Sequence, residues 1–311
     1  MKFIVDVSGE YKDVIVHYLI NDLIKHDDNS NEEVFFLGYN TSRDIQLKNK
    51  FSHYRKRVYL NWEAPCAFVS SQTSIEDQKY FTHVYTICPY TAEWLNNKKI
   101  GTNFISIPFP ISLNTFKDIL WNKEKEFDVI YTGTLFNSSY YDIISTMKNF
   151  KYIFTSLVNY LHPYNPTHVN VGCVDKWKLM SKSKISVCLN QAHYEPSCAH
   201  CISNIKGYPG WEESRAFTQI QNGIIPQFKS RITEAMGLKT LNLVKRDEWN
   251  VIENWFKPDV HFIYWDNKED LKEKMTHIIN NYGQYQHIID NAYEEVQKCD
   301  INYIYTNIIL K

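Results

Sequence analysis

The chain has 311 residues, and its 34 Lys and Arg against 35 Asp and Glu give a formal net charge of −1. This balance gives no long-range field for capturing nucleic acid or an anionic membrane. The length predicts two domains, because one core rarely extends past about 250–300 residues. The sequence has no signal-peptide pattern and no run near the about 18 apolar residues of a membrane span. Seven scattered cysteines favour reduced thiols and a cytoplasmic location.

The N-terminal part alternates apolar runs with segments of helical spacing. Expected strands cover residues 2–7, 34–37, 57–62, 84–87 and 104–107, and expected helices cover 14–24 and begin again at 92. The alternation predicts a parallel sheet, and the polar or Pro-containing loops after its strands would share one edge, where α/β proteins bind ligands. The loop Ser8, Gly9 and Glu10 lacks a G-x-G-x-x-G pattern, so no dinucleotide fingerprint is predicted.

A charged, linker-like segment over residues 112–126 precedes a second α/β series. Expected strands cover residues 127–132, 152–155, 184–189, 240–244 and 259–265. Expected helices cover 143–147, 177–183, 249–256, 282–296 and 301–310, with another carrying Leu271, Met275, Ile278 and Ile279 on its apolar face. The predicted domains are 1–122 and 123–298, followed by a C-terminal helix over 299–311. Residues 190–211 read as an irregular loop.

The most informative stretch is a loop, a short helix and a strand in the last third of the chain. Lys229, Ser230 and Arg231 lie where the helix would begin, and Gly237 lies where it would end. Free N–H groups and the helix dipole favour an anion at such a start, so cationic and hydroxyl side chains there suit a phosphate. Glu234, one turn further along, can accept hydrogen bonds from a ribose diol. The pattern predicts a nucleotide-sugar site.

The spacing of these residues alone also allows an interpretation without a ligand site. Ser230 can act as an ordinary N-cap, and Arg231 can be a solvated charge. Glu234 can be a residue that the helix dipole favours in the first turns.

A cluster of potential zinc ligands lies in the irregular loop. It contains His193, Cys198, His200 and Cys201, with C-x-x-C spacing between the two cysteines. Four such ligands can close a tetrahedral zinc site. A C-x-x-C pair without a partner pair is more typical of ordinary loop side chains, so we expect no metal site.

Glu63 is the candidate general base. It lies at an expected strand end between Trp62 and Pro65. Partial desolvation by the neighbouring indole would raise the pKa of this carboxyl group toward the range that suits a base. A surface carboxylate without a catalytic role is the alternative, and Asp6 and Glu10 are competing candidates.

Three motifs carry a resemblance to a known family. They are FDVIYTGT (127–134), KSRITEAMG (229–237) and DVHFIYWDNKEDL (259–271). They resemble the Gly loop that opens the C-terminal domain, the R-x-x-E-A-x-G nucleotide motif and the strand and helix after it in GT-B glycosyltransferases. The chain is similar to the group 1 glycosyltransferases, including small versions from large viruses and phages. The likeness covers roughly the last 190 residues, and the N-terminal half fits only in architecture.

The resemblance implies an α/β fold of two Rossmann-like domains facing a central cleft, and it assigns roles to individual residues. Glu234 matches the Glu of the E-A-x-x-G motif, which binds the donor ribose in that family. Lys229 and Arg231 match the basic residues that neutralise the diphosphate. Gly133 and Thr134 match the loop that approaches the donor phosphates. The final helix would cross back onto the N-terminal domain.

Two further positions bear on the stereochemistry. Many retaining members carry a second Glu eight residues before the first, and here that position is Pro226. Retention or inversion at the anomeric carbon therefore stays open. Glu63, Ala64 and Pro65 resemble an E-x-P segment of fucosyltransferases of the same fold, in which the Glu is a proposed base.

The resemblance implies a metal-independent hexosyl- or pentosyltransferase of glycan biosynthesis. The donor would be a UDP- or GDP-sugar in the C-terminal domain, bound as a co-substrate with no tightly held cofactor. The acceptor would be a hydroxyl group of a glycan or another molecule, and Arg231 would stabilise the leaving phosphate. Two alternatives are a nucleotide-sugar epimerase of the same fold and a non-catalytic module that binds nucleotide sugars.

Overall fold

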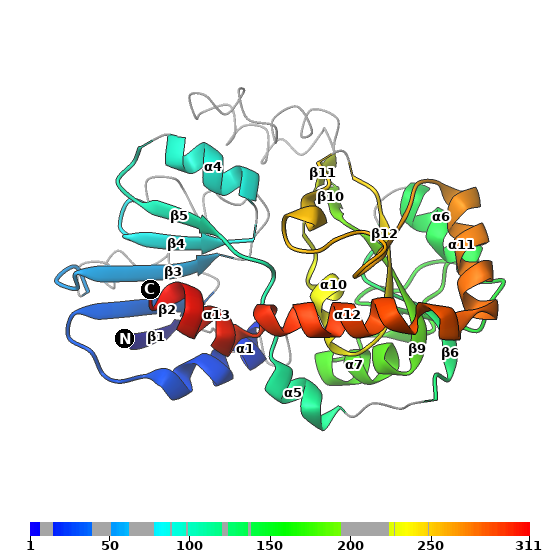
Figure 1. Cartoon of the computed structure of the whole chain (residues 1–311), viewed down its shortest axis with the longest axis horizontal. Coiled ribbons are helices and arrows are strands. Elements are labelled where there is room, and N and C mark those ends of the chain that lie inside the picture. The colour runs from blue at the N-terminus through cyan, green and yellow to red at the C-terminus, as the bar shows by residue number, and fades with distance from the viewer. Residues whose placement is uncertain are drawn as a thin grey trace. The chain divides into compact units, whose positions relative to one another are not determined.

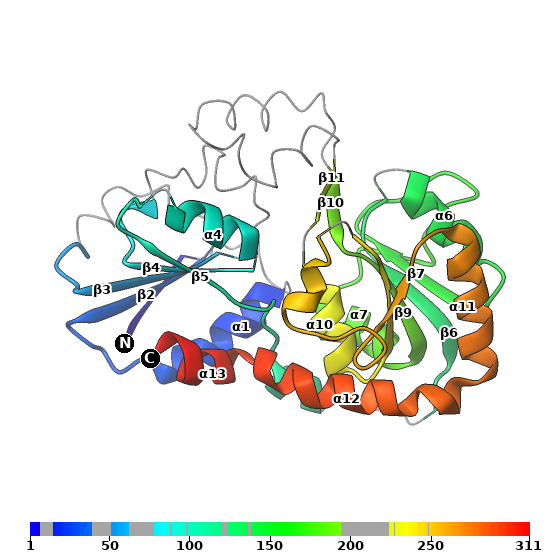
Figure 2. The same cartoon turned by 45° about the horizontal axis from the view of Figure 1, so that its top comes forward.

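The chain forms two compact units that differ in how their sheets are built (Figures 1 and 2). The computed structural model describes residues 1–6, 15–38, 51–61, 78–87, 89–97, 99–119, 124–135, 138–193, 224–226, 228–247 and 249–311. The first unit takes in the described residues of Met1–Lys12, Leu19–Phe109 and Gln191–Phe228. The second takes in those of Asp13–Tyr18, Pro110–Asn190 and Lys229–Lys311. The domain limits expected from the sequence, and the return of the last helix, stay predictions.

The first unit contains a parallel sheet whose strands follow the order of the chain. The strands are β1 (Lys2–Asp6), β2 (Glu33–Gly38), β3 (Lys56–Asn61), β4 (His83–Thr86) and β5 (Asn103–Ser106). Each pairs in parallel with the next. The helical segments of this part of the chain are α1 (Ile15–Leu23), the 3-10 turn η2 (Ile24–His26) and α4 (Pro89–Asn97). A short antiparallel pair, β10 (Gln191–His193) with β11 (Ile224–Pro226), also belongs to this unit.

Strand β2 shows why this sheet forms from these residues. Its run from Val34 to Leu37 is apolar without alternation, and all four side chains are buried. Continuous apolar runs of this kind suit parallel strands that are covered on both faces. The ring of Phe36 packs edge-on against Phe51 and Phe81, with centroids 5.8 and 5.5 Å away. Aromatic packing therefore fixes one face of the sheet.

The second unit contains a six-stranded parallel sheet with a different order, β13-β12-β9-β6-β7-β8. The strands are β6 (Phe127–Thr132), β7 (Tyr152–Ser156), β8 (His168–Val169), β9 (Ser183–Leu189), β12 (Leu241–Lys245) and β13 (Ile263–Trp265). From β6 the chain adds β7 and β8 on one side, and then β9, β12 and β13 on the other. The order therefore reverses between β6 and β9. In open α/β sheets a ligand crevice is expected outside the carboxyl ends of the strands at such a reversal.

Helices cover both faces of this sheet. Helices α6 (Ser138–Met147) and α11 (Lys268–Asn280) lie side by side in both views, and they share one core cluster with alternate residues of the strands (Figures 1 and 2). Helices α7 (Cys173–Ser181) and α10 (Ser230–Gly237) contact β6, β9 and β12. The remaining helical segments are α12 (Gln286–Val296), α13 (Ile301–Ile304), the π-helical turn η8 (Tyr305–Ile309) and the 3-10 turns η5 (Val251–Asn254), η6 (Tyr282–Tyr285) and η7 (Gln297–Cys299). None of the described helices is long and apolar enough to span a membrane.

The expected strands agree with the observed ones to within one residue at each end, except the last, expected over 259–265, where only β13 (Ile263–Trp265) forms. The short strands β8, β10 and β11 were not expected, and two further segments also differ. The stretch expected as a linker contains helix α5 (Leu113–Asp118). Ser112 caps this helix by accepting a hydrogen bond from the backbone N–H of Thr115 at 3.2 Å. Its Phe116 ring packs against Trp177, with centroids 5.0 Å apart, so tertiary packing stabilises a helix too short to be evident in sequence.

The second difference is at residues 249–256, where a helix was expected and only the 3-10 turn η5 forms. Asn250 has a left-handed backbone with φ 48°. The Asp247 side chain accepts hydrogen bonds from the N–H groups of Trp249 and Val251 at 3.0 and 3.1 Å. These local bonds compete with regular helix formation.

Candidate functional site

Helix α10 is fixed to the sheet by its apolar face. Ile232, Ala235 and Met236 form this face, and they are almost completely buried. Asn242 on β12 donates a hydrogen bond from its amide to the backbone carbonyl of Ile232 at 2.9 Å. Lys229, the N-cap residue, has an extended backbone, with φ −99° and ψ 139°. The first turn of the helix is thereby held in one position.

Gly133 brings the backbone at the end of β6 against the first turn of α10. Its φ is 135°, a conformation that L side chains rarely adopt, and its N–H donates to the Thr155 carbonyl at 2.9 Å. A Cβ at this position would lie 2.7 Å from Nη2 and 2.8 Å from Nη1 of Arg231. Only glycine therefore lets the guanidinium reach the carboxyl end of β6.

The Arg231 side chain is half-buried and lies among aromatic rings. Its Cζ is 5.6 Å from the centroid of the Tyr131 ring. Burial raises the pKa of Tyr131, and burial also raises the pKa of Tyr140 to about 12, so both phenols stay neutral. Among the described residues no carboxylate forms an ion pair with Arg231. Its positive charge is therefore available to an anionic ligand.

Glu234 is a fully buried carboxylate, and its partner is Lys176 of α7. The Lys176 ammonium donates a hydrogen bond to Oε1 at 3.0 Å and lies 2.9 Å from Oε2. The Glu234 side chain is 0% exposed and that of Lys176 is 20% exposed. A buried carboxylate without a partner is costly, so this contact stabilises the ionised group at the site.

These side chains line one cavity of about 280 Å³ within the second unit. The described lining residues are Ile15, Thr132, Gly133, Thr155, Ser156, Leu157, Val171, Cys173, Lys176, Ser230, Arg231 and Glu234. The cavity lies at the strand-order reversal, because Thr132 and Gly133 end β6 and follow it. Two cations and one carboxylate leave it with a net positive charge, which suits an anionic ligand with hydroxyl groups.

The structure thus brings together four of the residues singled out in the sequence: Gly133, Ser230, Arg231 and Glu234. Thr134 and Lys229 are half-buried neighbours that are not among the lining residues. The Thr134 carbonyl accepts a hydrogen bond from the Tyr131 hydroxyl at 3.2 Å.

The positions of several other candidate site residues are not described by the structure. Glu63, Glu10, Cys198, His200 and Cys201 lie outside the described residues, as do the side chains of Asp6 and His193. Within the described part of the chain, no group of three or more His, Cys, Asp or Glu side chains is arranged to hold a metal ion.

Lys176 is the functional candidate that sequence reasoning missed. The helix that carries it was expected over residues 177–183, whereas α7 begins at Cys173, directly after its N-cap Gly172. An acidic residue in the first turn, Asp175, was the available signal for this earlier start. The pairing of Lys176 with Glu234 joins positions 58 residues apart, so no local pattern could predict it.

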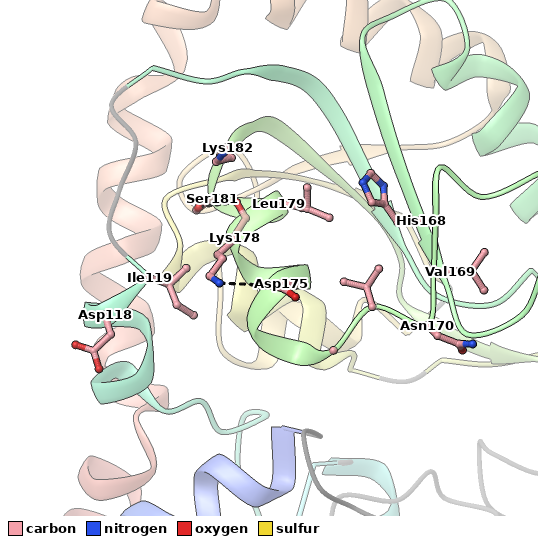
Figure 3. Close-up of a pocket in the computed structure, with 12 residues that line it drawn as sticks. Asp118, Ile119, His168, Val169, Asn170, Asp175, Lys178, Leu179, Ser181 and Lys182 are labelled. Atoms are coloured by element: carbon pink, nitrogen blue, oxygen red, sulfur yellow. Dashed lines mark hydrogen bonds and ion pairs between the residues drawn. The ribbon is translucent and has the colours of Figure 1, made fainter.

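A second, larger cavity of about 720 Å³ lies on another face of α7 (Figure 3). Asp175, Lys178 and Leu179 of α7 line it together with Ile119 and His168, among others. Its charged groups are partly satisfied within the protein, because Lys178 donates to Asp175 at 3.0 Å. We therefore take the cavity around Arg231 and Glu234 as the candidate site.

Comparison with known proteins agrees with this geometry. Residues 164–305 match the model of the glycosyl transferase-like family. No curated protein matches the chain in sequence.

Similar solved structures span nearly the whole chain. A glycosyltransferase from Rickettsia africae has 11% identity and a TM-score of 0.54, covering 98% of this chain and 82% of that one. HepE of Anabaena, in complex with UDP and glucose, has 10% identity and a TM-score of 0.58, covering 99% and 98%. An alpha-glucosyltransferase in complex with UDP-glucose and abasic DNA has 10% identity and a TM-score of 0.58, covering 96% and 84%.

The chain therefore has the GT-B fold, an α/β fold of two Rossmann-like units, as its motifs predicted. The predicted resemblance to GT-B glycosyltransferases is confirmed by the fold and by the family match over residues 164–305. The family match supports sugar transfer as the class of reaction. The likeness to small viral and phage members stays a prediction.

Proposed function

We propose that the protein transfers a hexosyl or pentosyl group from a UDP- or GDP-sugar to an acceptor hydroxyl. The observation that carries the proposal is the position of Arg231. Its guanidinium lies where a Cβ at position 133 would be, at the point where the strand order reverses, and it has no carboxylate partner among the described residues. A diphosphate is the part of a nucleotide sugar that such a cation recognises.

The other parts of the donor fit the rest of the cavity. The N–H groups in the first turn of α10 would add to the charge of Arg231 at the diphosphate. Glu234 would accept hydrogen bonds from the ribose hydroxyls. The cavity, at about 280 Å³, lies at the lower end of the usual range for small-molecule sites, so it would hold the ribose and diphosphate rather than the whole donor.

The proposed reaction breaks the bond between the anomeric carbon and the diphosphate oxygen. The acceptor oxygen forms the new bond to that carbon, and its proton passes to a base. In an inverting reaction Glu63 would be that base. Arg231 and Lys229 would stabilise the charge that develops on the leaving phosphate, without a resident metal ion.

The known partners of similar structures support a nucleotide-sugar donor, since HepE holds UDP and glucose and the alpha-glucosyltransferase holds UDP-glucose. The acceptor that we propose is a hydroxyl group of a glycan. The net charge of −1 argues against duplex DNA as the acceptor, because duplex binding normally needs a basic face.

The proposal is tested by incubating the full chain with UDP- and GDP-sugars, with and without candidate acceptors, and analysing the nucleotide products. Release of nucleoside diphosphate that depends on acceptor supports transfer. Conversion of the donor to its epimer would indicate an epimerase, and thermal stabilisation without turnover would indicate a binding module.

The matched variants are Arg231→Ala and Arg246→Ala. Arg246 lies on the same unit but is 48% exposed and pairs with Asp266 at 3.0 Å. We expect Arg231→Ala to weaken binding of UDP or GDP by roughly 10- to 100-fold, because a charged hydrogen-bond donor to the phosphate is lost. Arg246→Ala should bind like the parent. Equal nucleotide binding by Arg231→Ala and the parent would contradict the assignment.

A further inference from the structure

Lys176 and Glu234 form an ion pair that lines the cavity and lies mostly below the protein surface. The two residues come from different helices, α7 and α10, and both line the cavity. The Lys176 ammonium is within 3.0 Å of Oε1 and 2.9 Å of Oε2 of Glu234. With the carboxylate fully buried, the pair is held away from bulk water and its geometry is restricted.

One carboxylate oxygen retains unused hydrogen-bonding capacity. Oε1 accepts the hydrogen bond from Lys176, whereas Oε2 lies near the ammonium without hydrogen-bond geometry. Oε2 is buried and has no hydrogen-bond donor among the described residues. Buried polar atoms in this state are uncommon and are typically completed by a ligand or a water molecule. The carboxylate can therefore take a donor from a molecule in the cavity.

A ligand hydroxyl is the group that completes this pair. An ammonium only donates and a carboxylate only accepts, whereas a hydroxyl does both. A hydroxyl placed beside the pair can donate to Oε2 of Glu234 and accept from Nζ of Lys176. A ligand with a hydrogen atom in place of this hydroxyl would leave the buried carboxylate oxygen without a donor. Such a ligand would therefore bind with a less favourable free energy.

We propose that Lys176 is a positioning residue that makes the site select ribose over 2′-deoxyribose. This inference rests on the proposed function, because it takes the cavity to be the ribose and diphosphate site of a nucleotide sugar. Lys176 orients the Glu234 carboxylate and completes the contact to one ribose hydroxyl. The contribution of Lys176 is selectivity for the sugar of the nucleotide, whereas Arg231 provides affinity for the diphosphate.

The difference between the two cations supports this division. The charge of Lys176 is offset by Glu234 at 2.9 Å. Arg231 has no carboxylate partner among the residues that the structure describes. A phosphate therefore gains more from Arg231 than from Lys176. Replacing Lys176 should change the recognition of the ribose more than the recognition of pyrophosphate.

The experiment measures the affinity of the full chain for UDP, GDP, their 2′-deoxy forms and inorganic pyrophosphate by calorimetry. The variants are Lys176→Met, Lys176→Arg and, as a matched control on the same helix, Lys178→Met. Lys176→Gln keeps a neutral hydrogen-bond donor beside Glu234, so it tests the inference even where Lys176→Met folds poorly. Thermal denaturation checks the fold of each variant.

We expect the parent to bind the ribonucleotide roughly 10- to 100-fold more tightly than its 2′-deoxy form. Lys176→Met should lose most of this preference through weaker binding of the ribonucleotide, with little change for the 2′-deoxy form or pyrophosphate. Lys176→Arg and Lys176→Gln should each retain part of the preference, and Lys178→Met should match the parent.

Two results would overturn the inference while leaving the proposed function intact. They are a parent without preference for ribose, and a Lys176→Met variant that loses affinity equally for both forms. A parent that binds no nucleoside diphosphate would overturn the proposed function itself, and this inference with it.

Discussion

The two parallel sheets of this chain are assembled from similar strands in different orders. In the first, β1 to β5 lie side by side in chain order, with no reversal among the described strands. In the second, the order reverses between β6 and β9, and helices cover both faces. The loops beside a reversal diverge and leave a crevice at the carboxyl ends of the strands. The candidate cavity lies there in the second sheet, at Thr132 and Gly133.

An arginine in each unit illustrates the consequence. Arg57 on β3 donates from Nε to the Tyr80 carbonyl at 2.6 Å and from Nη1 to the Tyr54 carbonyl at 2.7 Å. Its donors are used to join segments of the first unit. Arg231 lies instead at the cavity, against the backbone of Gly133. The same residue type is a structural cross-link in one unit and a candidate ligand contact in the other.

The largest effect on stability is expected from Arg57→Ala. The substitution leaves two backbone carbonyls without charged donors, which should lower the free energy of unfolding by about 2–4 kcal/mol. Nucleotide affinity should stay that of the parent. Urea denaturation and calorimetry measure the two quantities. A loss of nucleotide affinity at unchanged stability would mean that the functional distinction between the two arginines is wrong.

Gly133→Ala tests whether the glycine after β6 leaves the space that the Arg231 side chain needs. A Cβ there would meet the Arg231 guanidinium at 2.7 Å, so we expect roughly 10-fold weaker UDP or GDP binding and a stability loss of about 1–3 kcal/mol. The matched control is Gly101→Ala in the first unit. Gly101 has φ 89°, and a Cβ added there would meet open space. This variant should lose about 1 kcal/mol of stability and no nucleotide affinity. Equal binding by both variants would contradict the role of Gly133.

Gly237→Ala tests the packing behind the site, with an intermediate effect. Gly237 ends α10, and a Cβ there would lie 2.8 Å from the Phe116 ring of α5. Overpacking should cost about 1–2 kcal/mol in the free energy of unfolding, despite the better helix propensity of Ala. The double variant with Phe116→Leu should recover part of this loss in thermal denaturation. No coupling between the two substitutions would show that the contact does not limit packing.

The last effect depends on pH and concerns Lys125, which joins two carbonyls of the second unit as Arg57 does in the first. Its ammonium donates to the carbonyls of Ser181, the last residue of α7, and of Lys239, two residues after α10, at 2.7 and 2.9 Å. Burial lowers the pKa of Lys125 from 10.5 to about 8. Between these values the folded protein has released a proton that the unfolded chain still binds, so rising pH stabilises the folded state.

We therefore expect the parent to gain stability relative to Lys125→Met as the pH rises from about 8 to 10.5, and to show a constant difference below pH 8. Chemical denaturation at a series of pH values measures this. A parallel pH dependence of parent and variant would show that the group titrates normally in the folded protein.

Much of the second unit follows from local sequence. The apolar runs at β6, β9 and β12 predict buried strands, because a parallel strand is covered on both faces. Ser230 and Gly237 bound α10 as predicted, although Gly237 is explained by its contact with Phe116 rather than by a positive φ. The short α5 was missed, because its stability depends on packing against Trp177.

The sequence by itself determined the GT-B resemblance, the elements around KSRITEAMG and the positions of Gly133, Arg231 and Glu234 on them, since caps and apolar periodicity act over a few residues. Only the tertiary structure decided the strand order of each sheet and the pairing of Glu234 with Lys176. Strand order depends on contacts between distant segments. The partner of a buried charge depends on which side chain folding brings within about 3 Å, and no pattern of spacing encodes that distance.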